Sequence, residues 1–367
     1  TEFTEMQDEF YMNLALQKAW ENQLLTYPNP AVGAVVLDNA GKILSIEAHE
    51  KAGFAHAEVL AVFRALENSD RNFTLKFLNS YNKNFNSNFK DTKNLSTEFN
   101  ANFIYDFIIK NHADKLKGGK IFVTLEPCSH SGKTPPCANL ISALKFKDCV
   151  IGAKDENKIA SGGAYILNRN GVNVKLGVCK NEAEILISPF KKWQKNGKFV
   201  FFKLALSANG VACGGIISNE KSRIFSHKLR AISDLLIIGG NTVRTDRPKL
   251  DTRLISGTKN PNIFIFSHSQ NFDKTIPLFS VPNRNVEIGE NIYEKLTNGL
   301  IMIEGGENFL REIKQNGKIC RQIDYFLFFH SNKFKNAQNL KIDMKFNQIF
   351  SSQNDDENYG WYEISKF

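Results

Sequence analysis

Apolar residues in the first half of the chain switch between helical and strand spacing. Tyr11, Leu14, Ala15 and Ala19 lie on one face of a helix predicted over 6–22. Further along, apolar runs between turn residues predict strands over 31–37, 43–49, 120–125, 149–153 and 173–178, and helices beginning at 56, 137, 163 and 182. This order of elements is typical of a three-layer α/β sheet.

A second α/β domain is predicted after the polar stretch 195–198. The pattern predicts strands over 199–206, 234–238, 262–266, 300–303 and 323–330, helices over 219–231 and from 307, and a loop-rich stretch over 241–253. Two strands end in glycine pairs, Gly239-Gly240 and Gly305-Gly306, and ligands of such sheets bind beyond the carboxyl ends of strands. We therefore divide the chain into a first domain core at 1–150, the end of its sheet and a linker at 151–198, and a second domain at 199–367.

Residues 68–117 differ from the rest of the first domain, because Asn, Phe, Lys and Ser recur there without a steady period. Only 103–109 is predicted to be helical. Such a low-complexity segment between a helix and a strand is typical of a partly mobile surface insertion. Its phenylalanines could instead dock on the body of the protein. An arm that binds nucleic acid through interleaved Lys and Phe is disfavoured, because Asp and Glu dilute the charge.

Charge is the next feature that bears on function. The chain has 47 Lys and Arg against 38 Asp and Glu, a net charge of +9 and a pI near 9.1. This balance fits either phosphate or nucleic-acid partners, or a bias toward Asn, Phe, Ile and Lys throughout the chain. We favour the bias, because no cluster of Lys and Arg follows one predicted helix face.

The apolar and cysteine content bears on compartment. No run of about 18 apolar residues occurs, so we expect no membrane span and no membrane partner. Residues 1–6 lack the basic and then apolar pattern of a signal peptide. The six cysteines are widely spaced, unlike those of a disulfide-rich secreted domain. We therefore expect a cytoplasmic protein with reduced thiols.

Two short stretches carry the clearest chemistry. His56-Ala57-Glu58 offers an imidazole and a carboxylate, and the stretch 124–137 offers Cys128 and Cys137. One His and two Cys can hold a tetrahedral zinc and leave the fourth position for water, as catalytic zinc requires. Glu58 would then be the acid/base beside that water. We expect both cysteines at helix N-termini, where the helix dipole favours thiolate. Each residue alone would more often be structural, but the joint pattern is typical of zinc-dependent deaminases of amino-pyrimidines and purines.

The spacing between the two cysteines narrows the substrate. Deaminases of nucleic acids use a tight Cys-x-x-Cys, whereas here Ser131 stands three residues after Cys128. The intervening loop contains His130 and Lys133, and Pro135-Pro136 stiffens it. A basic, stiff loop suits a small phosphorylated substrate rather than nucleic acid. The alternative is a loop that is longer without functional meaning.

These residues make the chain similar to a known family, the bifunctional riboflavin-biosynthesis deaminase/reductases (diaminohydroxyphosphoribosylaminopyrimidine deaminase/5-amino-6-(5-phosphoribosylamino)uracil reductase). The resemblance covers nearly the whole chain apart from 68–117. The first-half motifs that carry it are 6–9, 28–33, His49 with Gly53 and 56–58, and 124–137. The second-half motifs are 229–231, Thr242-Val243, Asp246, Pro248, Leu250, Thr252-Arg253 and 304–306.

The resemblance implies an N-terminal cytidine-deaminase-like domain and a C-terminal dihydrofolate-reductase-like domain. The first would use Zn²⁺ to hydrolyse the 2-amino group of 2,5-diamino-6-ribosylamino-4(3H)-pyrimidinone 5′-phosphate. The second would use NADPH to reduce the ribosyl group of the product, giving 5-amino-6-(5-phosphoribitylamino)uracil. We also expect a homo-oligomer that assembles through the reductase domain.

The resemblance also implies residue roles. Carried over by motif, the substrate positions are Asn29, His49, His130 and Lys133 in the first domain and Arg230, Leu250, Arg253 and Glu304 in the second. The cofactor positions are Ala205, Thr242, Asp246, Ser267, Gly305 and Gly306, where glycines would let the backbone approach a pyrophosphate. The chain departs from the family pattern at Asn209, Ile216 and Arg247.

Three functions fit the sequence. The first, which we favour, is the bifunctional enzyme. The second is a base deaminase acting on RNA or DNA, which the basic pI and the segment 68–117 favour and the cysteine spacing and second domain oppose. The third is an active deaminase whose C-terminal half is a binding or dimerisation module without catalysis.

Overall fold

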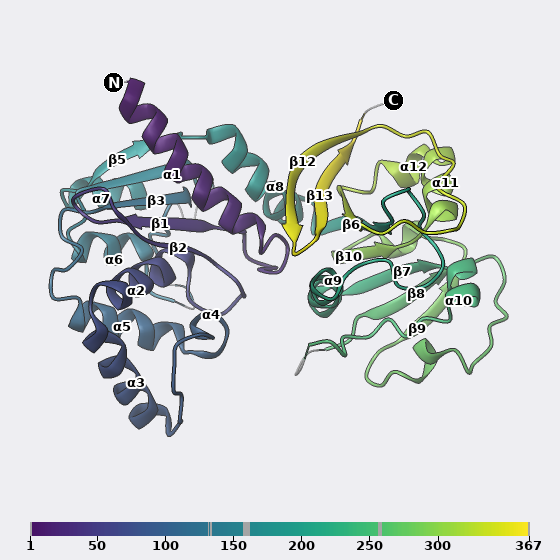
Figure 1. The fold of residues 1–367 in the computed structure, drawn as a ribbon, viewed down its shortest axis with the longest axis horizontal. Helices are drawn as coiled ribbons and strands as arrows, with labels where there is room; N and C mark the ends of the chain where they lie inside the picture. Colours follow the sequence, from purple (N-terminus) through teal and green to yellow (C-terminus); the bar gives the residue numbers. More distant parts are fainter. Residues whose placement is uncertain (1, 131, 133, 157–161, 256–258, 366–367) are drawn as a thin grey trace. The chain divides into compact units, whose positions relative to one another are not determined.

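The computed structural model describes every residue except 1, 131, 133, 157–161, 256–258 and 366–367. The chain divides into two units, Thr1–Phe190 and Lys191–Phe367 (Figure 1). Each unit contains its own sheet and is described by itself.

The first unit is built on a five-stranded sheet of order β2-β1-β3-β4-β5. Its strands are β1 (Gly33–Leu37), β2 (Ile43–Ala48), β3 (Lys120–Leu125), β4 (Asp148–Ala153) and β5 (Asn173–Leu176). Its helices are α1 (Glu2–Trp20), α2 (Ala57–Ser69), α3 (Arg71–Phe85), α4 (Leu95–Glu98), α5 (Ala101–Asn111), α6 (Cys137–Ala143), α7 (Gly163–Arg169) and α8 (Lys180–Asn196), the last of which continues past the end of the unit. Strand β1 is antiparallel to β2 and β3, whereas β3, β4 and β5 are parallel. The predicted α/β class is confirmed.

Helices cover both faces of this sheet. Gly152 in β4 shows one face, because an added Cβ there would meet Met12 of α1 and Ala183 of α8. The other face packs against α2 and α6 in a shared core that includes Val36, Ile121 and Ile151 of the strands. Burial on both faces explains why these strands are apolar throughout rather than alternating.

The segment 68–117 is more ordered than its sequence pattern predicts. It forms α3, α4 and α5, and the short helix expected over 103–109 is confirmed as part of α5. Asp70 caps α3 by accepting from the Asn72 N–H, and Asn100 caps α5 by accepting from the Phe103 N–H. The expectation of a largely irregular insertion was wrong, because its aromatic residues pack into the core of the first unit.

Those aromatic residues form a continuous cluster on the body of the first unit. Phe77 lies at its centre, with ring centroids 4.7 Å from Phe63 of α2 and 5.2 Å from Phe107 of α5. Edge-to-face pairs of this kind stabilise a fold beyond their area burial. The alternative in which the phenylalanines dock on the protein is the one that the structure supports.

The second unit contains an eight-stranded sheet of order β12-β13-β11-β6-β10-β7-β8-β9. Its strands are β6 (Lys198–Leu206), β7 (Leu235–Gly239), β8 (Asn262–Phe266), β9 (Val286–Gly289), β10 (Gly299–Glu304), β11 (Tyr325–His330), β12 (Phe346–Asn354) and β13 (Glu357–Ile364). Its helices are α9 (Glu220–Ile232), α10 (Gly240–Asp246), α11 (Glu307–Gln315) and α12 (Gly317–Cys320), with 3₁₀ turns η1 (Pro277–Ser280) and η2 (Tyr293–Lys295).

Strands β11, β6, β10, β7, β8 and β9 are parallel, and the hairpin β12–β13 adds antiparallel strands at one edge. Helix α11 packs on the face that includes Phe202 and Ile303, and Phe225 of α9 packs against Phe329 and Tyr359. The expected elements of this unit were incomplete in two places. The stretch 241–253 begins with the helix α10 rather than a loop. The hairpin β12–β13 was not predicted, because its sequence lacks a clear alternating apolar pattern.

A search of the described helices found none with the length and apolar character needed to cross a bilayer.

Candidate active sites

The start of α2 presents His56 and Glu58 together. His56 is the N-cap of this helix, with extended backbone (φ −72°, ψ 162°), and Glu58 lies in the first turn. Glu58 is only 4% exposed, so its carboxyl group is removed from water. The sequence places a polar pair here because the next apolar residues of α2 must face the core.

The two cysteines approach His56 from a different part of the chain. Cys137 is the first residue of α6, as predicted, but Cys128 lies in the loop after β3 and not at a helix N-terminus. That expectation is corrected. Helix α6 still acts on Cys128, because the Cys137 N–H donates to the Cys128 Sγ at 3.3 Å. The N–H groups of the first helical turn have no partner within the helix, so the Cys137 N–H is free to stabilise negative charge on Cys128.

The three side chains form a group that fits zinc. The Nδ1 of His56 lies 3.8 Å from the Sγ of Cys128 and 3.5 Å from the Sγ of Cys137. All three ligand atoms lie within 4.8 Å of one another. Zinc–sulfur and zinc–nitrogen bonds of ordinary length at tetrahedral angles would hold such atoms about 3.6 Å apart. The donor set and its spacing therefore match a zinc site with three protein ligands.

The pKa values of the two cysteines are shifted in opposite directions. The hydrogen bond between the side chains of Cys128 and Cys137 lowers the pKa of Cys128 to about 4, although burial works against this. The same side-chain bond and burial raise the pKa of Cys137. Burial also raises the pKa of Glu58 to about 7, against the effect of the charge on His56. A carboxyl group that titrates near neutrality can both accept and return a proton.

Second-layer contacts orient the imidazoles. The His56 Nε2 lies 3.4 Å from the Thr134 Oγ1, so with Nδ1 as the ligand atom, Nε2–H would donate to Thr134. His49 lies next to His56, with ring centroids 5.5 Å apart. Its Nδ1 donates to the Ala55 carbonyl at 3.0 Å, and its Nε2 accepts from the Asn29 Nδ2 at 3.1 Å, a tautomer assigned from these partners. Burial lowers the pKa of His49 to about 4, so it is neutral at pH 7.

The structure therefore brings Asn29 and His49 to the zinc ligands, as the resemblance implies. His130 lies two residues after Cys128, and its buried Nδ1 has no hydrogen-bond partner among the described residues. Lys133 lies outside the described residues. Thr134 was not predicted, because nothing in its sequence surroundings marks it except its place between the two cysteines.

Glu126 was also missed, although it holds the loop that carries Cys128. It is buried, and its carboxylate accepts from the N–H groups of Asp155, Gly162 and Ala164 at 3.0 to 3.2 Å. Glu126 thereby satisfies N–H groups at the start of α7. These bonds join the loop that carries Cys128 to the start of α7.

A second polar cluster lies at the carboxyl end of β10. Arg230 of α9 donates to both carboxylate oxygens of Glu304, from Nε at 2.5 Å and from Nη2 at 2.9 Å. Lys203 of β6 lies on the same carboxylate, with Nζ 3.8 Å away. Although burial alone would raise it, the pKa of Glu304 is lowered to about 2 by these cations. Burial lowers the pKa of Lys203, which the sequence analysis did not single out.

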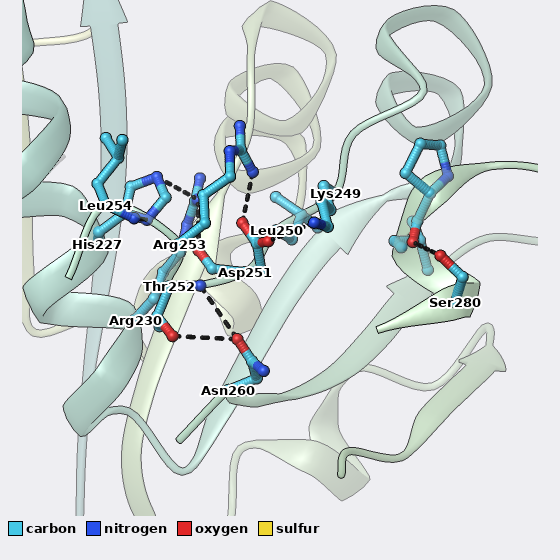
Figure 2. Close-up of polar contacts among 12 residues, drawn as sticks. His227, Arg230, Lys249, Leu250, Asp251, Thr252, Arg253, Leu254, Asn260 and Ser280 are labelled. Carbon is cyan, nitrogen blue, oxygen red and sulfur yellow. Dashed lines mark hydrogen bonds and ion pairs between the residues drawn. The ribbon is translucent and has the colours of Figure 1, made fainter. Parts of the chain in front are cut away.

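The predicted residues after α10 lie beside Arg230 (Figure 2). Arg253 pairs with Asp251, whose carboxylate also contacts Lys249 at 3.1 Å. Leu250 is buried with a positive φ of 53°, and the Arg230 Nη1 donates to the Asp251 carbonyl at 3.3 Å. Arg230, Leu250, Arg253 and Glu304 are therefore gathered in one cluster.

Two further side chains fix this loop and were not predicted. The Asn260 Oδ1 accepts from the N–H and the hydroxyl of Thr252, at 3.0 and 3.1 Å. The His227 Nδ1 accepts from the Leu254 N–H at 3.4 Å (Figure 2). Burial lowers the pKa of His227 to about 4, and the charge of Arg230 adds to this.

Residues expected to bind the cofactor lie at the ends of four parallel strands. Gly305 and Gly306 follow β10, Thr242 and Asp246 lie in α10 after β7, and Ser267 follows β8, while Ala205 lies near the end of β6. The two glycines differ. A Cβ on Gly305 would lie 2.8 Å from Phe309, whereas a Cβ on Gly306 would meet nothing within 4 Å. Gly305 is thus required by packing, and Gly306 leaves open space at the N-terminus of α11.

The departures from the family pattern have local explanations in two cases. Asn209 joins two loops, because its Oδ1 accepts from the Lys335 N–H and its Nδ2 donates to the Lys335 carbonyl. Arg247 ends α10 in left-handed conformation and pairs with Asp273 at 2.7 Å. Nothing in the structure explains Ile216, which is 70% exposed.

Two family models match the chain, one on each unit. Residues 5–153 match the cytidine and deoxycytidylate deaminase zinc-binding region, and residues 198–319 match the RibD C-terminal domain. The fold and the sites thus define a two-domain protein that joins a zinc-binding deaminase domain to a domain of the RibD C-terminal type. The two matches together make the chain similar to the RibD proteins of riboflavin biosynthesis.

Individual relatives agree with this family. The chain is 31% identical to riboflavin biosynthesis protein RibD of Aquifex aeolicus over 261 residues, which are 69% of this chain and 60% of that protein. It is 31% identical to RibD of Mycobacterium tuberculosis over 259 residues, 68% of this chain and 62% of the relative. The matches therefore span less than two thirds of these relatives' length.

Solved structures agree in fold. Acinetobacter baumannii RibD (form 1) superposes with a TM-score of 0.59 at 22% identity, covering 99% of this chain and all of that one. A diaminohydroxyphosphoribosylaminopyrimidine deaminase/5-amino-6-(5-phosphoribosylamino)uracil reductase from Thermotoga maritima gives a TM-score of 0.58 at 23% identity, with the same coverage.

Proposed function

We propose that the chain is a bifunctional enzyme of riboflavin biosynthesis. Its first unit would hydrolyse the 2-amino group of 2,5-diamino-6-ribosylamino-4(3H)-pyrimidinone 5′-phosphate. Its second unit would reduce the ribosyl group of the product to ribityl, giving 5-amino-6-(5-phosphoribitylamino)uracil. The observation that carries the proposal is the convergence of His56, Cys128 and Cys137 beside a buried Glu58, in a chain whose second half matches the RibD C-terminal domain.

In the first reaction, Zn²⁺ held by His56, Cys128 and Cys137 would lower the pKa of a water molecule toward 7 and make it nucleophilic. Glu58 would accept one proton of this water and deliver it to the ring nitrogen, and would then transfer the second proton, from the new hydroxyl group, to the amino group that leaves as ammonia. Asn29 and the neutral His49 would orient the base or ribose. His130 would contact the substrate, and its buried Nδ1, which has no hydrogen-bond partner among the described residues, supports this role. Lys133 would contact the phosphate.

In the second reaction, NADPH would supply a hydride to the sugar carbon. Arg230 and Arg253 would contact the substrate phosphate, and Leu250 and Glu304 would line its site. Arg230 already pairs with Glu304, so this pair would position rather than neutralise the ligand. Lys203 lies beside Glu304 and would donate a proton to the sugar oxygen. Ala205, Thr242, Asp246, Ser267, Gly305 and Gly306 would face the cofactor.

We assign the deaminase to 1–150, its last sheet elements and the linker to 151–198, and the reductase to 199–367. The six cysteines, which form no disulfide among the described residues, support a reducing, cytoplasmic location. A small phosphorylated pyrimidine, rather than nucleic acid, is the proposed partner, and like chains would assemble through the reductase domain.

Mass spectrometry of the products tests the substrate assignment. The zinc-loaded protein should convert the free diaminopyrimidine phosphate to a product heavier by about one mass unit, as an amino group is replaced by oxygen on the ring. Addition of NADPH should then add two hydrogens. Deamination of cytosine or adenine in an oligonucleotide, without reaction of the free pyrimidine, would contradict the proposal.

A further inference from the structure

A tyrosine of the 68–117 segment contacts the chain directly before a zinc ligand. The Tyr105 hydroxyl, on α5, donates to the Pro136 carbonyl at 3.1 Å, and Tyr105 is only 8% exposed. Pro136 is the N-cap of α6, and Cys137 is the first residue of that helix. The hydrogen bond therefore fixes the peptide unit that joins Pro136 to Cys137.

The position of the Pro136–Cys137 peptide unit affects both cysteine side chains. The Pro136 carbonyl also accepts from the N–H groups of Asn139 and Leu140 in the first turn of α6. Cys137 is fully buried, and its own N–H donates to the Cys128 Sγ. A shift of the Pro136–Cys137 peptide would thus move one ligand atom and weaken the hydrogen bond to another.

The same segment also holds the helix that carries His56 and Glu58. Arg64 of α2 donates to the hydroxyl and carbonyl of Thr92, at 2.8 and 2.7 Å, and the Thr92 hydroxyl donates to Glu67 at 2.7 Å. Phe63 of α2 packs against Phe73 of α3, with ring centroids 5.2 Å apart. One continuous segment therefore contacts α2 and α6, which between them supply two of the three metal ligands.

We propose that α3 to α5 form a clamp across the zinc site and that Tyr105 is its positioning residue for Cys137. The inference rests on the zinc ligand set of the proposed function. Loss of the Tyr105 hydroxyl loosens the start of α6 and weakens zinc binding. Deamination slows through misplacement of the ligand, and the reductase is unaffected.

The test compares Tyr105→Phe with Tyr81→Phe in the full chain. Tyr81 is a matched control, because it is buried in the same segment and its hydroxyl also makes one backbone bond, accepting from the Asn100 N–H at 2.9 Å. That bond stays within the segment. Competition with a zinc chelator should show about tenfold weaker zinc binding for Tyr105→Phe, as expected for a lost buried hydrogen bond, and wild-type binding for Tyr81→Phe.

Kinetics add a second readout. At saturating zinc, Tyr105→Phe should lower the kcat of deamination more than it changes KM, and it should leave NADPH oxidation with pre-deaminated substrate at the wild-type rate. Wild-type zinc affinity in Tyr105→Phe, or an equal loss in both variants, would overturn the clamp. Cys137→Ser separates the two claims: if it too retains wild-type zinc affinity, the ligand set itself is wrong.

Discussion

At the scale of single residues, Glu58 is distinguished by its burial beside His56, Cys128 and Cys137, the three side chains that we propose as metal ligands. Its pKa is raised to about 7 by burial. A carboxyl group in this position is suited to proton transfer rather than to metal binding, because the ligand group consists of His56, Cys128 and Cys137.

Glu58→Gln should therefore retain zinc and lose deamination by about 10²- to 10⁴-fold, the range expected for removal of a general acid/base. Metal analysis of the purified variant and an ammonia-release assay would measure the two quantities. Glu182→Gln, which also changes an acidic residue in the first turn of a helix of this unit but at an exposed position, is the control. A Glu58→Gln variant with a near-normal rate would remove the acid/base role.

Glu304 gives a pH-dependent prediction. Its pKa is lowered to about 2 by Arg230 and Lys203 despite burial, against about 4.3 in an unfolded chain. Between these values the unfolded state binds more protons, so stability falls as pH drops through this window and is fully present above it. Thermal unfolding of the wild type should show this loss from about pH 4 to pH 2.

Glu304→Gln should be less stable at neutral pH, because Arg230 then lacks a charged partner, and its unfolding midpoint should change less between pH 4 and pH 2. An equal pH dependence in both proteins would show that Glu304 is not held ionised by its neighbours.

Residue types and spacing predicted that His56, Cys128, Cys137 and Glu58 would come together, because these residues are close in sequence within two motifs. Thr134, Glu126 and Tyr105 escaped prediction, since each acts through hydrogen bonds to partners distant in sequence. Nothing in a lone Thr, Glu or Tyr marks such a contact. Arg230 and Glu304 were brought into view by resemblance and not by any pattern of their own.

At the scale of elements, close packing of α7 against the Cys128 loop depends on one glycine. A Cβ added to Gly163, the first residue of α7, would lie 1.8 Å from the Pro127 carbonyl oxygen. The loop and the helix would have to separate, although Glu126 accepts from N–H groups of both Gly162 and Ala164.

Gly163→Ala should therefore destabilise the first unit by about 1–3 kcal/mol, as overpacking commonly does, and weaken zinc binding through Cys128. Gly317→Ala is the control, because an added Cβ there meets nothing within 4 Å. Thermal unfolding and zinc titration would compare the two. Equal unfolding temperatures and equal zinc affinities in the two variants would mean that the Cys128 loop adjusts to the added Cβ without loss of stability.

Elements with a strong apolar period were predictable, such as β3 and α7, whose bounds match those expected. Helices α3 and α4 were not, and of α5 only 103–109 was, because Asn, Lys and Ser recur among their apolar residues and the phenylalanines find partners only in three dimensions. The hairpin β12–β13 was missed for a related reason. Strand β12 is largely exposed and therefore carries no alternating apolar signal.

At the scale of the whole molecule, two units each carry a polar site of different chemistry. The first gathers thiols, imidazoles and a buried carboxyl group, and the second gathers cations around Glu304. Composition alone favoured neither site, because the net charge of +9 is spread over the chain. The prediction of a deaminase half followed by a reductase half came from the order of the motifs, and one family model matches each half.

The most direct test of this account is the ratio of ammonia released to NADPH oxidised by the zinc-loaded protein given the diaminopyrimidine phosphate. The account predicts ammonia release without NADPH, no NADPH oxidation after zinc removal, and one NADPH oxidised per ammonia when both are present. Full deamination with no NADPH oxidation would contradict it and would reduce the second half to a binding or dimerisation module.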